Sequence, residues 1–295
     1  MQEQGIKAKQ LLAKTKNRQW FGTDYNMNIY RGCHHGCIYC DSRSECYQIE
    51  DFDTVTYKEQ ALQILNKELQ GKRNRGVVGF GAMSDAYNHL EKKKKLTAGA
   101  LQLFDTHGFG VSLATKSDLL TRDIPLFQAI QVHSPVNLGF SFSTSHDVLA
   151  QKIEHHVAKP SQRFQAIEQC RQADLYCGVL MMPILPYITD NWKLVADLVY
   201  QSHAVGANYI YPLFGMTLRD RQRDYYLDKV GKLSQDVSEK YQQHYKNTYY
   251  FGSPHAKKLW YEFQNLCTKL GITYQMEEII HHYQKPYQVE QGTLF

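Results

Sequence analysis

The sequence of 295 residues lacks the features of membrane and secreted proteins. It contains no stretch of about 20 apolar residues, so we expect no membrane-spanning helix. Met1 to Gln10 contains no apolar run, which argues against a secretory signal peptide. The chain does have seven cysteines. Because disulfides are rare in the reducing cytosol, clustered cysteines there more often bind metal or do chemistry, and we expect a cytoplasmic protein.

The sequence also has little net charge and no repeated segments. The formal net charge is +5, which permits an anionic partner without requiring one. We find no short internal repeat and no low-complexity segment. Basic residues gather near the start, at Lys7, Lys9, Lys14, Lys16 and Arg18. We interpret residues 1–22 as a basic N-terminal arm, which is either solvated and partly disordered or in contact with nucleic acid.

Apolar runs typical of strands alternate with amphipathic stretches of helix length. We predict six strands at 28–31, 75–83, 109–115, 136–144, 177–184 and 207–214. We predict helices at 57–70, 94–108, 123–131, 161–173 and 190–206, the last two capped by Ser161 and Asp190. Parallel strands need helical crossovers, so the pattern predicts an α/β fold, a partial (β/α)6 TIM-type barrel. A doubly wound sheet remains an alternative, because the sequence does not fix curvature.

The predicted barrel occupies only part of the chain. We assign it to residues 23–218. Residues 219–287 contain helical patterns without a further βα unit, and we expect a helical C-terminal extension there. We expect residues 288–295 to form a flexible tail.

Three cysteines, Cys33, Cys37 and Cys40, lie in the short stretch MNIYRGCHHGCIYCDSR at 27–43. A structural zinc site usually has four ligands in two separated pairs, and the second pair is missing here. An iron–sulfur cubane is normally held by four thiolates. Three closely spaced thiols hold three irons and leave the fourth open to a bidentate ligand from a cofactor.

The segment CHHGCIYC, with Tyr39 as its aromatic residue, resembles the Cys-x3-Cys-x-aromatic-Cys signature of the radical SAM enzymes. The resemblance implies a [4Fe–4S] cluster on the three cysteines and S-adenosylmethionine (SAM) on the open iron. It also implies an external one-electron reductant. Reduction then cleaves SAM to a 5′-deoxyadenosyl radical that abstracts hydrogen from a substrate, while the protein positions the reactants and excludes solvent.

Further segments resemble the spore photoproduct lyase-like branch of this family: GAMSDAY at 81–87, SLATKSDLLTRDIPLF at 112–127 and MPILPYITDN at 182–191. The resemblance implies a nucleic-acid substrate, with damaged DNA the first candidate. It places Ser84 and Asp85 at the methionine part of SAM, Lys116 at its carboxylate or ribose, and Ser141 or Ser143 near the sugar. We expect only one of these two serines to face inward. The alternative roles are turn caps for Ser84 and Asp85 and a surface charge for Lys116.

The chain departs from spore photoproduct lyase in its cysteines. That enzyme returns a hydrogen atom through a cysteine some tens of residues beyond the cluster motif, and here no cysteine lies between Cys46 and Cys170. Reversal of a thymine dimer by that route is therefore in doubt. Cys46 is a candidate substitute donor; the alternative is an ordinary buried thiol.

The tail QVEQGTLF resembles the short motif with which bacterial repair proteins bind the sliding clamp, through Gln291, Leu294 and Phe295. The alternative is a tail that packs on its own domain. Two other functions remain open. One is a non-catalytic, DNA-associated metal-binding module recruited by the clamp, and the other is a radical SAM enzyme acting on a small molecule or peptide. We interpret the histidine pairs at 155–156 and 281–282 and the lysines at 92–95 as surface residues.

Overall fold

The computed structural model describes residues 4–81, 83–244 and 248–288, and its centre is a seven-stranded sheet. Six parallel strands stand in the order β10-β9-β8-β7-β6-β3, and β2 pairs antiparallel with β3 at the edge. The strands are β2 Leu12–Lys14, β3 Tyr25–Met27, β6 Val77–Phe80, β7 Gly110–Thr115, β8 Val136–Phe142, β9 Cys177–Met181 and β10 Ile210–Pro212.

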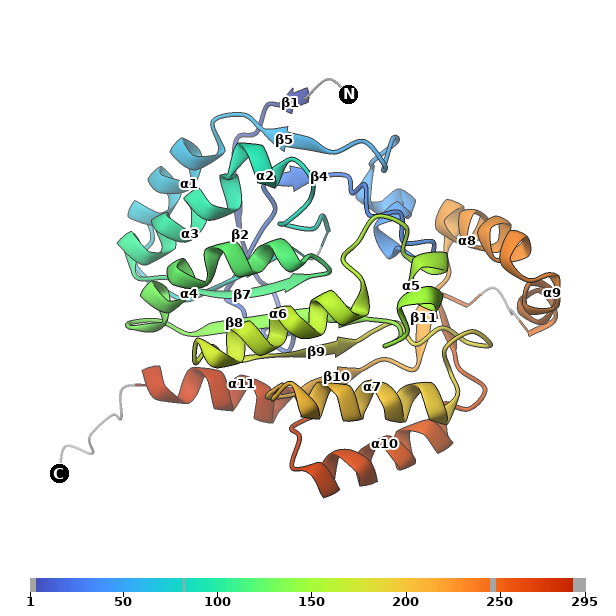
Figure 1. Ribbon diagram of the computed structural model, residues 1–295. Helices are drawn as coiled ribbons and strands as arrows, with labels where there is room; N and C mark the ends of the chain where they lie inside the picture. Colours follow the sequence, from blue (N-terminus) through green and yellow to red (C-terminus); the bar gives the residue numbers. More distant parts are fainter. Residues whose placement is uncertain (1–3, 82, 245–247, 289–295) are drawn as a thin grey trace.

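The order of the strands decides between the two predicted architectures. A doubly wound sheet reverses its strand order part-way, whereas the parallel strands here follow the order of the chain. The crossover helices therefore cover one face of the sheet, as Figure 1 shows. They are α1 Ala61–Gln70, α3 Leu96–His107, α4 Ile124–Gln131, α6 Pro160–Gln172 and α7 Trp192–Ala204. The predicted partial (β/α)6 barrel is confirmed.

Local signals explain most helix ends. Gly108 ends α3 with a φ of +69°, and Pro125 stands in the first turn of α4, where its missing N–H costs nothing. Two predicted caps are wrong. α6 begins at Pro160, and Ser161 hydrogen-bonds Asp147 instead. The cap of α7 is Asn191, whose side chain accepts from the backbone N–H of Leu194.

The N-terminal part differs from the prediction. The first barrel strand is β3, and the predicted strand 28–31 supplies only β4, Tyr30–Arg31. β4 belongs to a separate small sheet with β5, Thr56–Lys58, and β1, Gln4–Ile6. Residues 4–22 are not a free arm, because β2 pairs with β3 and the Leu12 side chain is fully buried.

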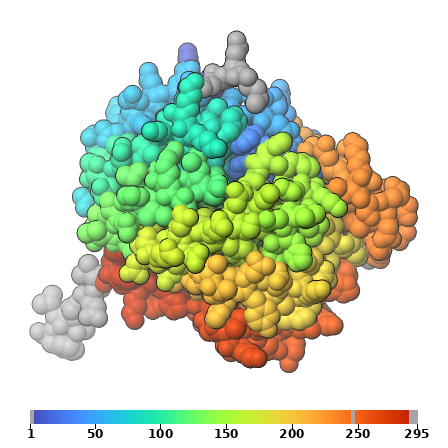
Figure 2. Space-filling view, in the orientation of Figure 1, coloured from blue at the N-terminus to red at the C-terminus, as the bar shows by residue number. Residues whose placement is uncertain are grey.

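The C-terminal extension is mainly helical, as predicted, and adds one strand. Its α8 and α9 project from the side of the molecule, drawn in orange in Figure 2. The elements are α8 Asp220–Leu233, α9 Gln235–His244, β12 Tyr250–Gly252, α10 Ala256–Leu270 and α11 Met276–Gln284, and β12 pairs with β11 Gly215–Thr217. α11 closes over the inner face of the barrel, where Ile279 packs against Phe21 and Tyr209.

Short elements complete the connections. They are η1 Asp41–Arg43, η2 Glu45–Tyr47, α2 Glu91–Lys94, η3 Asp118–Asp123, α5 Asp147–Ile153 and η4 Lys285–Tyr287. In the described part of the chain, no helix has both the length and the apolar character needed to cross a membrane.

Candidate active site

A cavity of about 440 Å³ occupies the inner side of the barrel. One end is formed by the loop that carries Cys33, Cys37 and Cys40, and all three line the cavity. The same end receives Asp85 and Lys116 from the loops that follow β6 and β7. In barrels of this kind the active site lies at the C-terminal ends of the strands, and these residues stand at that end.

Backbone geometry fixes the loop that carries the cysteines. Gly32 has a φ of +78°, and a Cβ there would lie 2.2 Å from the carbonyl oxygen of Thr54, so only glycine fits. Ser84 donates a 2.5 Å hydrogen bond to the Gly32 carbonyl, and the N–H of Cys33 donates to the carbonyl of Phe52 at 2.7 Å. The loop is therefore held in place before any cofactor binds.

The three thiols lie in surroundings that disfavour their charged forms. Burial raises the pKa of Cys33 to about 12, with Cys40 and Asp85 adding to the effect. Burial also raises the pKa of Cys37 and Cys40. Thiolates here require a nearby positive charge, and metal coordination supplies one because a coordinating thiol is deprotonated.

The donor set fits a cluster better than a single ion. Within residues 4–81, 83–244 and 248–288, no three His, Cys, Asp or Glu side chains lie close enough together to hold one metal ion. A cubane of four irons is larger and holds its thiolates farther apart than a tetrahedral zinc does. Three thiols that line one cavity therefore suit an iron–sulfur cluster.

Asp85 joins the loops at this end of the cavity. Its Oδ1 accepts hydrogen bonds from the Thr115 hydroxyl at 2.7 Å and from the N–H of Tyr87 at 2.8 Å. Its Oδ2 accepts from the backbone N–H of Lys116 at 2.8 Å and lies 3.6 Å from Nδ1 of His35. The Lys116 ammonium lies 5.6 Å from the ring centre of Tyr39, so a cation faces the cysteine loop.

A buried ion pair fastens the cysteine loop to the barrel. Cys37 forms a backbone bridge with Glu154, and the hydroxyl of Tyr39 donates to the Glu154 carboxylate. Arg163, from α6, pairs with Glu154 at 2.5 Å, and both side chains are at most 1% exposed. Burial disfavours the charge of Glu154, but Arg163 and Lys116 outweigh this and lower its pKa. Arg163 also donates to the Ser141 carbonyl, which ties the loop to β8.

The sequence model of the radical SAM superfamily matches residues 27–199, more than half of the chain. The chain belongs to the radical SAM superfamily. It is therefore a radical SAM enzyme, and members of this family use a [4Fe–4S] cluster and SAM. The match begins at β3 and runs through the cysteine loop to α7.

Two relatives are known from their sequences as uncharacterized proteins. An uncharacterized protein of Mycobacterium tuberculosis is 28% identical over 261 residues, which cover 86% of this chain and 76% of the relative. An uncharacterized protein of Methanocaldococcus jannaschii is 29% identical over 196 residues, covering 65% of this chain and 71% of the relative. The similarity extends across bacteria and archaea, but the names of these relatives indicate no substrate.

Solved structures confirm the predicted resemblance to spore photoproduct lyase at the level of the fold. The lyase complexed with dinucleoside spore photoproduct superimposes with a TM-score of 0.62 at 12% identity, covering 90% of this chain and 79% of the lyase. The radical SAM methyltransferase TsrM from Kitasatospora setae superimposes with a TM-score of 0.53 at 10% identity, covering 83% and 51% of the two chains. The shared fold is therefore common to enzymes of different chemistry.

Not every residue named from the radical SAM resemblance faces the cavity. Ser84 is buried and holds Gly32, so it positions the cysteine loop. Ser141 lines the cavity, whereas Ser143 donates to the hydroxyl of Tyr39 at 2.9 Å. Residues two apart on a strand share a face, so strand alternation does not separate the two serines. Instead, β8 ends at Phe142, so Ser143 lies beyond the strand, where the chain turns and directs its hydroxyl toward Tyr39.

Cys46 lies apart from the other cysteines of the loop. It is exposed, it is not among the residues that line the cavity, and the Ser44 hydroxyl lies 3.4 Å from its sulfur. The expectation of an ordinary buried thiol is wrong, and its position outside the cavity speaks against the role of hydrogen donor. Gln291, Leu294 and Phe295 lie outside the described residues.

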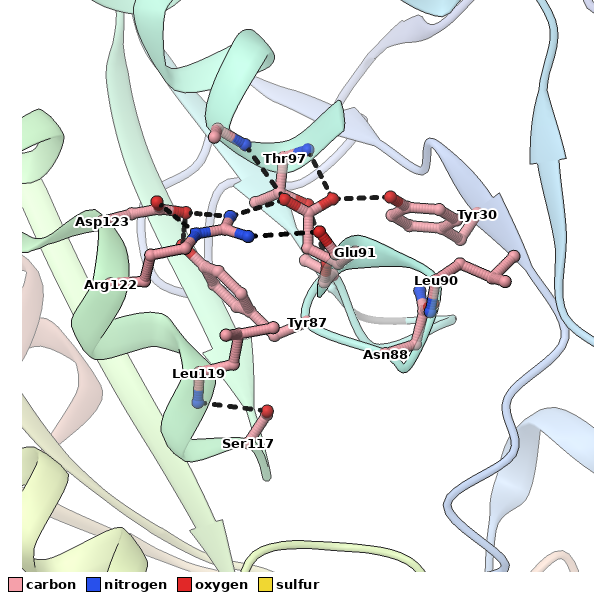
Figure 3. A network of polar contacts seen from close by, with 12 residues as sticks. Tyr30, Tyr87, Asn88, Leu90, Glu91, Thr97, Ser117, Leu119, Arg122 and Asp123 are labelled. Carbon is pink, nitrogen blue, oxygen red and sulfur yellow. Dashed lines mark hydrogen bonds and ion pairs between the residues drawn. The ribbon is translucent and has the colours of Figure 1, made fainter. Parts of the chain in front are cut away.

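The side chain of Glu91 is completely buried in a network of polar contacts. Figure 3 shows its carboxylate accepting from the Tyr30 hydroxyl at 2.5 Å, the N–H of Thr97 at 2.9 Å and Arg122 at 2.6 Å. The carboxylate thereby satisfies free N–H groups at the start of α3, and Arg122 continues the network to Asp123. The network joins β4, just before the cysteine loop, to the chain after β7.

A group of histidines was also missed. The ring of His34 lies 4.9 Å from His35, 4.2 Å from His89 and 6.5 Å from His156, measured between ring centres. Burial, together with the charges of the neighbouring histidines, lowers the pKa of His34 to about 3. His155 and His156 are both exposed, as predicted, but the sequence does not show that the chain after α5 brings them beside the cysteine loop, where the N–H of His156 donates to the carbonyl of His35.

Proposed function

We propose that this radical SAM enzyme binds a [4Fe–4S] cluster through Cys33, Cys37 and Cys40 and SAM beside it, and that its substrate is nucleic acid. The observation that carries the cofactor part is the shared cavity: the three thiols, Asp85 and Lys116 all line it. When bound and reduced by an external donor, the cluster supplies the electron that starts radical chemistry on SAM.

The chain's own residues have distinct tasks in this proposal. Lys116 is the one Lys or Arg among the described residues that line the cavity, and it offers a cation to the carboxylate of SAM. Asp85 already accepts three hydrogen bonds from Thr115, Tyr87 and Lys116, so we assign it the task of positioning Lys116. Ser141 stands on the strand next to Lys116 and offers a hydroxyl to the sugar.

The nucleic-acid part rests on different support. The chain is mildly basic, and the lyase of similar fold was solved with a dinucleoside ligand. Trp20 lines the cavity while 46% of its surface stays exposed, and it packs edge-on against Tyr211. Exposed aromatic rings are what single-stranded nucleic acids stack on. We also propose that Gln291, Leu294 and Phe295 bind a bacterial sliding clamp, which would bring the enzyme to DNA.

Electron paramagnetic resonance tests the cofactor proposal. Protein reconstituted anaerobically with iron and sulfide is reduced with dithionite, and its spectrum is recorded with and without SAM. We expect a reduced-cluster signal that changes when SAM is added, followed by formation of 5′-deoxyadenosine. A signal indifferent to SAM, or zinc in place of iron, would favour the non-catalytic, DNA-associated module instead.

Two cysteine variants make the test specific. Cys37→Ser removes a thiol that lines the cavity, and we expect it to lose the signal that responds to SAM. Cys46→Ser changes an exposed cysteine of the same region outside the cavity and should keep it. Equal loss in both variants would contradict the assignment. Activity without any affinity for DNA would favour a small-molecule or peptide substrate.

A further inference from the structure

One row of residues across the inner face of this barrel has unusually small or polar side chains. TIM-type barrels normally fill the interior with bulky branched side chains. Here four neighbouring strands contribute Asn26, Gly79, Ser112 and Asn137, which stand in register with one another and all line the cavity. We call these four residues the polar floor. One level nearer the cysteines, Ala114 and Gly139 are paired and equally small.

Hydrogen bonding on the polar floor is incomplete. Asn137 is only 2% exposed, and its Nδ2 donates to the Ser112 hydroxyl at 3.0 Å. Its Oδ1 has no hydrogen-bond partner among the residues that the structure describes. Buried polar atoms are nearly always paired, so an unpaired amide oxygen in a cavity wall points to a partner outside the protein. A polar ligand with an N–H or O–H donor would satisfy it.

Glycine makes room for a second amide on the polar floor. A Cβ at Gly79 would lie 2.7 Å from Oδ1 of Asn26, the neighbouring residue in the row. Any side chain at position 79 would displace that amide. The floor therefore presents two neutral amides, each with a donor and an acceptor.

The polar floor lies well away from the cysteine loop. Lys116 directly follows β7 and stands four residues beyond Ser112, which corresponds to roughly 13 Å at the rise of a strand. The charged Asp and Lys residues of the cavity lining, Asp41, Asp85 and Lys116, all follow the cysteine loop or the C-terminal ends of strands. The end of the cavity away from the cysteine loop is thus neutral, with Asn137 buried and Asn26 exposed there. Its walls include Phe21 and Tyr209, whose ring centres are 5.9 Å apart.

We propose that the polar floor binds the hydrogen-bonding edge of one nucleobase of the substrate, with Asn137 as a specificity-determining residue. The inference rests on the proposed nucleic-acid substrate. A base is flat and neutral, and its edge carries adjacent donors and acceptors that amide side chains match. Enzymes that act on bases take them out of the stack and read their edges by hydrogen bonds in a pocket, and the amides of the polar floor can make such bonds.

Binding of a small probe tests the proposal. The probe is the dinucleoside monophosphate of thymidine, because thymine has one ring N–H between two carbonyls and a methyl group at N3 blocks it. Affinities of the methylated and unmethylated probes are measured by calorimetry on the full, reconstituted chain with SAM and without reductant, so that no turnover occurs. We expect the wild-type protein to bind the methylated probe about tenfold more weakly, the usual effect of one hydrogen bond.

The variant Asn137→Leu removes both amide functions at similar size. We expect this variant to bind the two probes equally, because the methyl group at N3 weakens binding only when the Asn137 amide is there to accept the ring N–H. Asn66→Leu changes an amide on α1 that bonds His107 outside the cavity, and it should discriminate as the wild type does. The comparison of the two probes on the wild-type protein stands even if Asn137→Leu does not fold.

Equal binding of both probes to the wild-type protein would overturn the inference, and so would discrimination that persists in Asn137→Leu. So would the absence of any binding while the cluster signal still responds to SAM, a result that leaves the cofactor proposal standing. If the probes are discriminated but no SAM-responsive signal forms, the cofactor proposal fails and the inference about the polar floor is supported.

Discussion

The buried pair of Glu154 and Arg163 gives the sharpest prediction about how the site is held. Neither side chain is more than 1% exposed, and Glu154 lies opposite Cys37 in a backbone bridge. Glu154→Gln keeps the shape of the side chain but removes its charge, which leaves the Arg163 guanidinium buried without a counter-ion. Breaking a buried pair in this way typically costs about 3–5 kcal/mol of unfolding free energy.

The loss should be visible as a lower melting temperature. For a chain of this size, 1 kcal/mol corresponds to roughly 2 °C, so we expect Glu154→Gln to melt about 6–10 °C below the wild type. The double variant Glu154→Gln with Arg163→Met no longer buries a charge and should recover part of the loss. Iron bound per chain should fall in the single variant, because Glu154 and Tyr39 fasten the cysteine loop.

Arg171 lies on α6, as Arg163 does, and its substitution provides a matched control for an arginine that is not paired with a buried carboxylate. It donates to the backbone carbonyls of Leu175 and Gly206 and is only half-buried. Arg171→Met should therefore lower the melting temperature by only about 2 °C. Differential scanning calorimetry of four variants, Glu154→Gln, Arg163→Met, the double variant and Arg171→Met, settles the comparison. If Glu154→Gln melts no lower than Arg171→Met, or if the double variant is worse than the sum of the singles, the reasoning about a buried counter-ion is wrong.

Two further predictions concern the cysteine loop and the tail. Gly32 and Gly271 have similar positive φ values, +78° and +69°, but a Cβ at Gly32 meets the Thr54 carbonyl whereas one at Gly271 meets nothing within 4 Å. Gly271→Ala should cost about 1 kcal/mol and Gly32→Ala at least ~2 kcal/mol more, with a loss of bound iron; equal costs in thermal unfolding would contradict this. Phe295→Ala should weaken binding to a purified bacterial sliding clamp at least tenfold in surface plasmon resonance, since such anchors carry most of a peptide's affinity. Undiminished binding would rule out the motif.

The main features of the fold follow from local patterns. Alternating strand and helix stretches predicted a parallel sheet, because parallel strands require crossovers. Gly108 and Pro125 marked the end and the start of helices through their own backbone restrictions, which do not depend on the rest of the fold. The spacing of Cys33, Cys37 and Cys40 identified the site, since three thiols within eight residues stay together in any fold.

Where side chains meet was decided only by the tertiary structure. The resemblance to the family placed Ser84 and Ser143 beside SAM, yet their hydroxyls bond Gly32 and Tyr39 because of how the chain turns after β6 and β8. The pairing of Glu154 with Arg163 depends on how α6 packs against α5, which Glu154 directly follows, and no local pattern encodes this packing.

The same limit applies to the polar floor. Asn26, Gly79, Ser112 and Asn137 are scattered over 112 positions of the sequence and become one row only through the register of four strands. Residue type and spacing determine what a segment can form and which chemistry it can carry. Register and packing decide which distant residues share a cavity, because those contacts depend on the whole chain at once.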